Sequence, residues 1–311
     1  MINVKNYLSL VKFSHTIFAM PFAIIGFALA AQQLTSAATE ANGPGSPAAL
    51  SNYELIGRFI LVIFCMIFAR SAAMAFNRYL DSHFDAQNPR TAIREIPAGI
   101  ISKESALRFV IINCLLFMIA TFFINSICFF LAPVALFVIL FYSYTKRFTA
   151  LCHLVLGVGL SLAPIGAYLA VTGQFAVLPL LFSLTVLFWV SGFDIIYALQ
   201  DQAFDRSQDL HSIPAALGKT KALRVSEILH VLSAICVIAA GWYGGFGLIY
   251  WFGVAIFCGM LFYQHSIVKP ADLSKVNIAF MTANGIASVA FSILVLLDIF
   301  VYGSFFHHQS I

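Results

Sequence analysis

The chain has 311 residues, of which 61% are hydrophobic and only 10% are charged, with a formal net charge of +4 and a mean hydropathy of +0.93. Soluble domains carry about 25% charged residues. Because so few charges cannot cover a water-facing surface, the composition excludes an ordinary soluble domain and indicates that lipid is the main solvent. The six cysteines lie in apolar stretches without a CxxC pair, which argues against a disulfide framework or a zinc site.

Apolar segments long enough to cross a bilayer recur along the whole chain. A membrane helix needs about 20 predominantly apolar residues. Short turns that contain Gly or Asn, such as Asn125-Ser126 and Thr172-Gly173, separate several of these segments. The predicted fold is therefore all-α, a polytopic membrane protein with nine transmembrane helices in residues 14–32, 56–76, 106–124, 127–145, 149–171, 175–198, 222–242, 246–265 and 277–302.

The first apolar segment has a second interpretation. Lys5 and Lys12 precede it and small residues end it, as in a secretory signal peptide. The run from residue 13 to residue 31 is longer than the usual signal core of about 7–15 residues, and it contains Pro21. We therefore expect a retained helix.

The basic residues predict the orientation in the membrane. All lysines and arginines except Arg58 and Arg70 fall at the N-terminus or in the connections between spans 2 and 3, 4 and 5, 6 and 7, and 8 and 9. Lysine and arginine accumulate in cytoplasmic loops. We expect the N-terminus and these connections to be cytoplasmic and the C-terminus to be outside.

Acidic residues are scarce, yet they gather in two segments at the predicted cytoplasmic ends of spans 2 and 6. In the first segment Asn77, Asp81 and Asp85 are spaced i, i+4, i+8, which puts them on one face of a helix. In the second, the spacing i, i+3, i+7, i+11 predicts another shared face for Asp194, Tyr197, Asp201 and Asp205. Two acidic stripes are thus expected at the mouths of two helices.

A divalent cation explains why like charges would be set so close together. Mg²⁺ is held by carboxylate oxygens together with substrate phosphates, so two facing stripes would hold ions that bridge a diphosphate. The alternative is a pair of solvated acidic helix ends. That alternative is disfavoured because both stripes lie on one side of the membrane in a chain with only 13 acidic residues.

Basic residues surround these stripes. Arginine and lysine clamp transferring phosphate groups, although the cytoplasmic bias of positive charge explains most of them without a site. Arg70 differs, because it lies inside span 2, where an unpaired charge is costly. We expect it to face a cavity and to pair either with a carboxylate of the protein or with a carboxylated substrate. The expected substrate-binding cations near the stripes are Arg78, Arg90, Arg94, Lys146, Arg147 and Arg206.

The stripes carry a family resemblance that covers essentially the whole chain. Asn77-x₃-Asp81-x₃-Asp85 resembles the first signature of the UbiA-type membrane prenyltransferases, and Tyr197-x₃-Asp201-x₃-Asp205 resembles their second. The run from Asn88 to Gly99 is similar to the loop after the first signature in the 4-hydroxybenzoate branch, and Tyr144-Thr145-Lys146-Arg147 is similar to the loop after span 4.

The resemblance implies one domain over residues 1–311, with nine helices around a central cavity and cytoplasmic capping loops. It implies Mg²⁺, a polyprenyl diphosphate donor, an aromatic acceptor of ubiquinone or menaquinone synthesis, no nucleic acid, and a place in the lipid of a bacterial inner membrane. Glu95 and the Asn88-Pro89 pair depart from the 4-hydroxybenzoate pattern, and Lys12 stands where an Arg is often found. An aminodeoxyfutalosine-type nucleoside of the menaquinone pathway therefore remains an alternative acceptor.

The resemblance also assigns roles. The residues expected to hold Mg²⁺ on the diphosphate are Asn77, Asp81, Asp85, Asp201 and Asp205. Tyr144 and Tyr197 are expected to contact the diphosphate. Asp194 and Asp201 are alternative candidates for the base that removes the ring proton. Two rival classes remain: a transporter of an anionic lipid or metabolite, disfavoured because the polar groups lie at one interface rather than at the midplane, and a non-catalytic binding protein, disfavoured because the acidic positions are intact.

Overall fold

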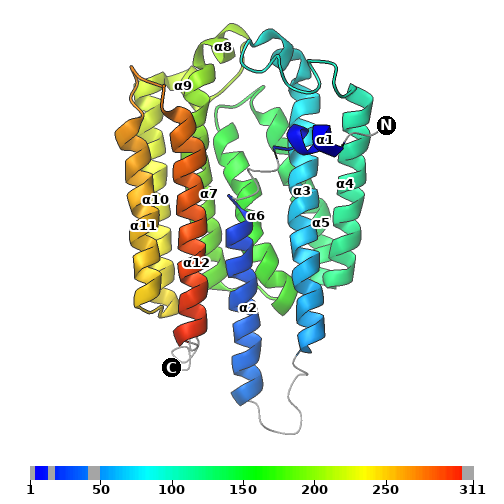
Figure 1. The fold of residues 1–311 in the computed structure, drawn as a ribbon, viewed down its shortest axis with the longest axis vertical. Helices are drawn as coiled ribbons and strands as arrows, with labels where there is room; N and C mark the ends of the chain where they lie inside the picture. Colours follow the sequence, from blue (N-terminus) through cyan, green and yellow to red (C-terminus); the bar gives the residue numbers. More distant parts are fainter. Residues whose placement is uncertain (1–3, 13–17, 41–49, 303–311) are drawn as a thin grey trace.

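The computed structural model describes residues 4–12, 18–40 and 50–302, a part of the chain that contains helices and no strand of a sheet. The long helices run side by side as one bundle (Figure 1). In chain order the helices are α1 (Val4–Leu10), α2 (Met20–Glu40), α3 (Asn52–Gln87), α4 (Lys103–Ile124), α5 (Ser126–Thr145), α6 (Cys152–Thr172), α7 (Val177–Ala198), η2 (Leu199–Asp201), α8 (Gln202–Ser207), α9 (Ile213–Leu217), α10 (Lys219–Gly244), α11 (Leu248–Ile267), η3 (Ile278–Ala283) and α12 (Asn284–Tyr302).

The predicted membrane spans correspond one to one to helices of the bundle. In the described residues, eight helices are long and apolar enough to cross a membrane, and the apolar part of α2, Met20–Thr35, is a shorter ninth. Part of the first predicted span, residues 13–17, lies outside the described residues. Span 2 is longer than predicted, because α3 continues without a break to Gln87. This continuation carries the first acidic stripe on a regular helix.

Several helix ends are fixed by side chains that satisfy free backbone groups. Ser51 and Glu54 form a capping box at the start of α3, with the Ser51 amide donating to Glu54 Oε2 at 2.8 Å. The buried carboxylate of Asp298 accepts from the amides of Gly247 and Tyr250, at 2.8 and 3.0 Å, where α11 begins. The first amides of a helix have no partner within the helix, so Asp298 has a structural role.

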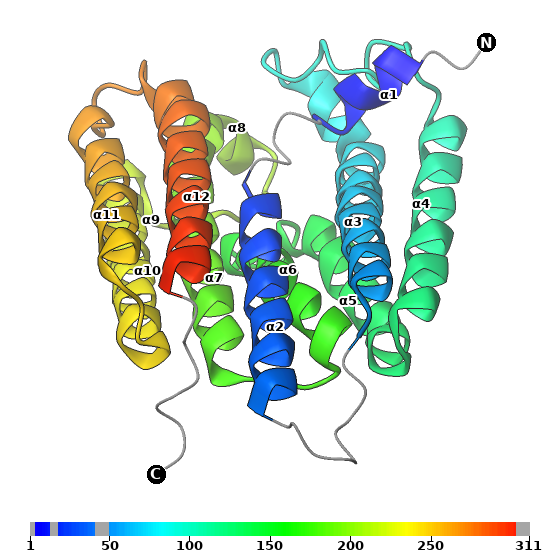
Figure 2. The same cartoon turned by 60° about the horizontal axis from the view of Figure 1, so that its bottom comes forward.

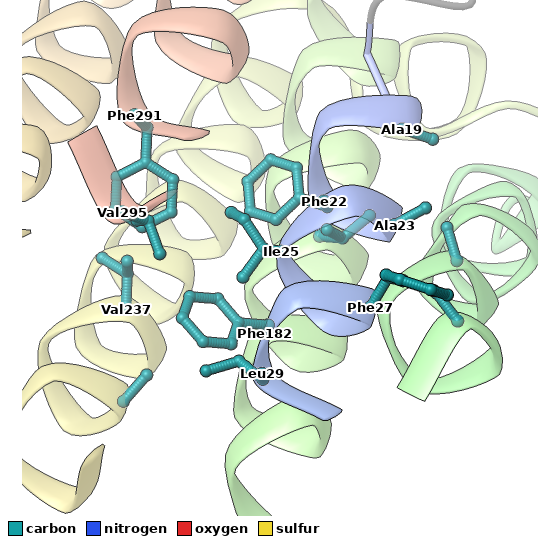
Figure 3. Close-up of a cluster of buried hydrophobic side chains, with 14 of the residues drawn as sticks. Ala19, Phe22, Ala23, Ile25, Phe27, Leu29, Phe182, Val237, Phe291 and Val295 are labelled. Carbon is teal, nitrogen blue, oxygen red and sulfur yellow. The ribbon is translucent and has the colours of Figure 1, made fainter. Parts of the chain in front are cut away.

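Helix α2 runs through the middle of the bundle. Its residues Phe22, Ile25 and Leu29 are fully buried, and they face Phe182 of α7 and Phe291 of α12 (Figure 3). The rings of Phe22 and Phe291 lie 5.8 Å apart. Because lipid is as apolar as these side chains, close packing rather than exclusion from water stabilises such contacts. The helix is therefore an integral part of the bundle, as the retained-helix prediction requires.

Gly26 allows α2 to approach α6 closely. A Cβ atom at this position would lie 2.1 Å from the carbonyl oxygen of Pro164, which is far inside van der Waals contact. Small residues permit such close contacts between membrane helices.

A polar contact joins three helices near the start of α12. The Asn284 side-chain oxygen accepts from Trp189 Nε1 of α7 and from Gln264 Nε2 of α11, both at 2.8 Å. Its amide nitrogen donates to the Phe280 carbonyl at 2.9 Å, within the π-helical turn η3. Side chains of this kind hold membrane helices together.

Short helices cap one end of the bundle. The short helices α8 and α9 lie at the same end of the bundle as α1, whereas α12 ends at the opposite end (Figure 1). Figure 2 shows α8 and α1 at their shared end from a second side, and η2 leads directly into α8. The prediction of one continuous helix through the second acidic stripe is wrong. Helix α7 stops at Ala198, a 3₁₀ turn runs to Asp201, and α8 begins at Gln202. The tighter turn of about 3.0 residues rotates Asp201 and Asp205 off the face that an α-helix would give them.

Candidate active site

A polar cavity of about 590 Å³ lies beneath the cap, between the ends of α3 and α7. Its lining includes Asn77, Asp81 and Asp85 from the first stripe and Asp194, Tyr197, Asp201 and Asp205 from the second. The two stripes therefore meet in one cavity at one end of the bundle. This convergence is the geometry that the interpretation as a shared cation and diphosphate site requires.

The first stripe keeps its helical spacing. The Asn77 amide donates to Asp81 Oδ2 at 3.1 Å, as expected for residues one turn apart. Asp85 is buried and forms an ion pair with Arg94 at 2.6 Å, and Arg78 Nη1 lies 3.9 Å from its other oxygen. Both arginines thus lie beside the first stripe, inside the cavity lining.

The loop after α3 crosses to the second stripe. Arg90 donates from Nε to Asp201 Oδ1 at 3.0 Å and from Nη2 to Asp201 Oδ2, and its Nη1 donates to the Tyr197 hydroxyl at 3.0 Å. Asn88 also donates to Asp201, at 3.2 Å. Burial disfavours the charge on Arg90, but the hydrogen bonds and attraction of Asp201 outweigh it and raise the arginine's pKa. Arg90 is therefore a permanent positive charge at the second stripe.

Asp205 is fully buried and is held by two partners. Lys146 lies 2.7 Å from Asp205 Oδ1, and Ser212 donates to Oδ2 at 2.8 Å. Burial disfavours the charge on Lys146, but the attraction and hydrogen bond of Asp205, together with the charges of Asp201 and Asp81, outweigh it and raise the lysine's pKa. The lysine after α5 is thus brought to the second stripe, as the prediction of a phosphate-binding cation requires.

Arg70 lies at the junction of the polar cavity with a second, apolar cavity of about 370 Å³. Both cavities are lined by Arg70, Met74, Tyr142, Leu156 and Leu160. The prediction that Arg70 faces a cavity is confirmed. Pairing with a carboxylate of the protein is not observed, because no carboxylate of the described residues forms an ion pair with Arg70 and its buried Nε has no acceptor there. Pairing with a carboxylated substrate stays a prediction.

Three of the predicted binding residues lie outside the cavity lining. Arg206 is directed to the cap, where its Nε donates to the Ala215 carbonyl at 2.7 Å. Tyr144 is partly exposed and lies under the guanidinium of Arg147, whose carbon is 5.3 Å from the ring centroid. Arg147 also donates to Asp81, at 3.4 Å. Arg147 therefore touches the first stripe from outside, whereas Arg206 supports the cap.

The sequence interpretation missed His153. This residue is buried at the start of α6, and its Nδ1 lies 2.6 Å from Asp194 Oδ2. Both side chains line the polar cavity. No spacing signal marks His153, because its partner is on another helix 41 residues away.

The carboxylates present a donor set that fits a hard divalent cation. They supply oxygen atoms from two facing segments, which is the ligand type that Mg²⁺ prefers. Asp85 Oδ2 is buried and accepts no hydrogen bond from the described residues. Within that part of the chain, however, no three His, Cys, Asp or Glu side chains converge on one point. Three of the carboxylates are instead paired with basic side chains: Asp85 with Arg94, Asp201 with Arg90 and Asp205 with Lys146.

The fold and the cavity together define a class of protein: a multi-pass helical membrane protein with a polar, acid-lined cavity at one end that opens into an apolar cavity within the bundle. The model of the UbiA prenyltransferase family matches residues 19–286. The chain belongs to the UbiA prenyltransferase family, as the resemblance of its two signatures implies.

Relatives with known names and structures agree with this membership. A 4-hydroxybenzoate octaprenyltransferase of Tolumonas auensis is 28% identical over 246 residues, which cover 79% of this chain and 84% of the relative. Another, of Francisella tularensis subsp. mediasiatica, is 29% identical over 250 residues, with 79% and 87% covered.

Solved structures share the fold. The apo structure of a UbiA homologue from Aeropyrum pernix K1 matches with a TM-score of 0.77 and 28% identity, covering 96% of this chain and 100% of that chain. A UbiA homologue from Archaeoglobus fulgidus bound to GPP and Mg²⁺ matches with a TM-score of 0.67 and 18% identity, covering 95% and 100%. Because the second match is only 18% identical, it supports the fold alone.

Proposed function

We propose that this chain transfers a polyprenyl group from polyprenyl diphosphate to an aromatic acceptor of quinone biosynthesis, with Mg²⁺ bound by the two acidic stripes. The observation that carries this proposal is the joining of two cavities of opposite character. An acid-lined cavity with basic walls suits a metal-bound diphosphate, and the apolar cavity next to it suits a prenyl chain. The named relatives, which are 4-hydroxybenzoate octaprenyltransferases, support the same reaction.

The residues of the two stripes would hold the ion and the diphosphate. Mg²⁺, when bound, neutralises the negative charge that grows on the leaving diphosphate. The basic side chains that already pair with the stripes supply a second source of positive charge at the same place. The proposed metal ligands are Asn77, Asp81, Asp85, Asp201 and Asp205, and the proposed diphosphate contacts in the cavity wall are Arg78, Arg90, Arg94, Lys146 and Tyr197. Arg147 would assist from outside through Asp81.

The protein's contribution to ionisation is charge, orientation and exclusion of water. The allylic C–O bond breaks and its electron pair leaves with the diphosphate. The resulting carbocation requires a dry site. The rings of Phe18, Phe193 and Phe280 lie 5.4 to 5.5 Å from one another in the cavity wall. Aromatic faces attract nearby cations, so this cluster suits a wall that shields the cation.

Carbon–carbon bond formation then needs an oriented acceptor and a base. A ring carbon supplies the electron pair for the new bond to the prenyl carbon, and the proton at that ring carbon must leave to restore aromaticity. Arg70 is charged, lies at the junction of the two cavities and has no carboxylate partner among the described residues. We propose that Arg70 binds the carboxylate of a 4-hydroxybenzoate-like acceptor. We propose that Asp194 accepts the proton that leaves the ring carbon.

The proposed location is the inner membrane, with the polar cavity facing the cytoplasm. The distribution of lysine and arginine supports this orientation, because the basic loops lie at the end of the bundle that carries the polar cavity. A long prenyl donor then remains within the lipid while its diphosphate reaches the aqueous side.

The deciding experiment is transfer by the purified protein in lipid. A labelled polyprenyl diphosphate is incubated with Mg²⁺ and, separately, with 4-hydroxybenzoate, 1,4-dihydroxy-2-naphthoate and an aminodeoxyfutalosine-type nucleoside, and the products are weighed by mass spectrometry. A prenylated aromatic acid is expected together with released diphosphate. If no acceptor is prenylated but an anionic lipid or metabolite crosses vesicles that contain the protein, the transporter alternative is correct instead.

A further inference from the structure

We infer that His153 is a positioning residue that orients the carboxylate of Asp194 as the proton acceptor of the transfer reaction. This inference rests on the proposed function. His153 is the second residue of α6, and Asp194 lies in the last turn of α7, so the contact joins two neighbouring helices. Their atoms Nδ1 and Oδ2 lie 2.6 Å apart, a short hydrogen bond of the kind that charged partners make.

The surroundings of the imidazole assign its proton. On the other side of the ring, the backbone amide of Ile213 donates to His153 Nε2 at 3.3 Å. Because Nε2 faces a donor, it must carry the lone pair, and the proton of the neutral ring is on Nδ1. Nδ1 therefore donates to Asp194, which accepts as a carboxylate. His153 is not available to take a proton from the substrate, because its only basic nitrogen is engaged.

The carboxylate of Asp194 keeps one oxygen for the cavity. The histidine engages Oδ2, and Asp194 makes no other side-chain hydrogen bond with the described residues. The Asp194 side chain is 25% exposed, whereas that of His153 is only 3% exposed. The buried partner therefore fixes the carboxylate, and Oδ1 remains free to receive a proton. A base must lie within hydrogen-bonding reach of the proton that it removes, which a freely rotating carboxylate would satisfy only part of the time.

A purely structural role is the competing explanation. Ile213 opens the cap helix α9, whose preceding residue Ser212 also donates to Asp205. His153 thus tethers the cap as well as Asp194, and loss of either contact could lower activity. The two contacts use different ring nitrogens, which allows them to be separated by substitution.

Two variants of similar size separate the two contacts. In His153→Asn the amide nitrogen stands where Nδ1 stands, so the donor to Asp194 is kept and the acceptor for Ile213 is lost. In His153→Gln the amide oxygen reaches the place of Nε2, so the acceptor for Ile213 is kept and the donor to Asp194 is lost. We expect His153→Asn to retain kcat within about threefold, and His153→Gln to lower kcat about 100-fold, the size of effect that misplacement of a catalytic group produces. The KM for the prenyl diphosphate and the thermal unfolding temperature should be nearly unchanged in both.

The same assay contains the results that would overturn this inference. Equal losses in both variants, a larger loss in His153→Asn, or near-normal kcat in His153→Gln would each refute the positioning role. A further test compares Asp194→Asn with the double variant Asp194→Asn/His153→Gln. Because His153 acts through Asp194, the second substitution should add less than about threefold to the loss. If the wild-type protein prenylates no acceptor, the proposed function itself fails. If the wild type is active and His153→Gln leaves kcat near normal, only the role of His153 is refuted.

Discussion

Arg90 and Asp201 form a two-point ion pair that ties the loop after α3 to the 3₁₀ turn after α7. The two residues are 111 positions apart in the chain, and the pair joins the loop that follows the first stripe to the second stripe in the lining of the polar cavity. A fork of this kind matches a phosphate as well as a carboxylate. The same guanidinium therefore holds the second stripe in the free protein and is in position to receive the diphosphate.

Replacement of Arg90 should weaken binding of the donor. We expect Arg90→Ala to raise the KM for the prenyl diphosphate about 10- to 100-fold, which corresponds to about 1.4–2.7 kcal/mol of lost charge-assisted contact. The KM of Arg90→Lys should lie between those of the wild type and Arg90→Ala, because lysine keeps the positive charge but cannot donate two parallel hydrogen bonds. Steady-state kinetics measure this, with Arg108→Ala as the control, since Arg108 is exposed on α4 outside the cavity lining. An unchanged KM in Arg90→Ala would show that the diphosphate binds elsewhere.

Loss of a stripe carboxylate should change the demand for metal. Chelation with EDTA is expected to abolish transfer, and added Mg²⁺ to restore it. In Asp85→Asn and Asp205→Asn the Mg²⁺ concentration for half-maximal activity should rise at least about tenfold, because each loses one anionic ligand. Asp272→Asn, an exposed acidic residue outside the cavity lining, should match the wild type. Activity that resists EDTA, or variants with an unchanged Mg²⁺ dependence, would contradict the metal assignment.

Hydrophobicity and helical spacing predict most of the fold and the first stripe. Within the described residues, the eight spanning helices and the shorter α2 match the nine predicted apolar segments, because a bilayer permits few other structures. Asn77 and Asp81 lie where the spacing predicts because α3 is a regular helix through this region. The break after Ala198 was not predictable from spacing, because the residues that form the 3₁₀ turn have no special sequence signal.

Contacts between distant segments are the part that sequence reasoning could not supply. Neighbours in sequence can point in different directions, as Asp205 in the cavity and Arg206 at the cap demonstrate. Positions about 100° apart on a helix face different surroundings. His153 was missed because its partner, Asp194, is distant in sequence and lies on the next helix. Nothing near His153 in the sequence marks this contact.

The Lys146–Asp205 ion pair predicts a loss of stability at high pH. The pKa of Lys146 is raised above its ordinary value of 10.5 in the folded protein, so the protonated lysine stabilises the fold. That contribution is fully present below pH 10.5 and is lost as the pH rises through the higher folded pKa. Thermal unfolding in detergent should show a step above pH 10.5 that is absent in Lys146→Gln. The exposed Lys221 offers the control Lys221→Gln, which should keep the step.

Close packing of α2 on α6 predicts that Gly26→Ala destabilises the bundle. Its Cβ would meet the Pro164 carbonyl at 2.1 Å, so the two helices must separate. Overpacking of this kind typically costs about 1–3 kcal/mol. The unfolding temperature in detergent should fall, whereas Gly259→Ala, whose Cβ meets nothing within 4 Å, should leave it unchanged. A wild-type unfolding temperature in Gly26→Ala would mean that α2 and α6 are not in close contact.

The apolar cavity predicts a position that limits the length of the prenyl donor. Gly166 lines this cavity, and a Cβ built on it meets no atom within 4 Å, so a larger side chain would extend into the space proposed for the prenyl tail. Gly166→Phe should therefore lower kcat/KM for an octaprenyl donor at least about tenfold. A loss of this size is expected when the apolar contacts of about one isoprene unit are excluded from the cavity. A geranyl donor should be used as well as by the wild type. Gly259→Phe places the same side chain on a helix outside the cavity lining and controls for general effects of the substitution. Equal loss with both donors would indicate a disturbed fold, and no loss with either would mean that the prenyl chain leaves the polar cavity by another route.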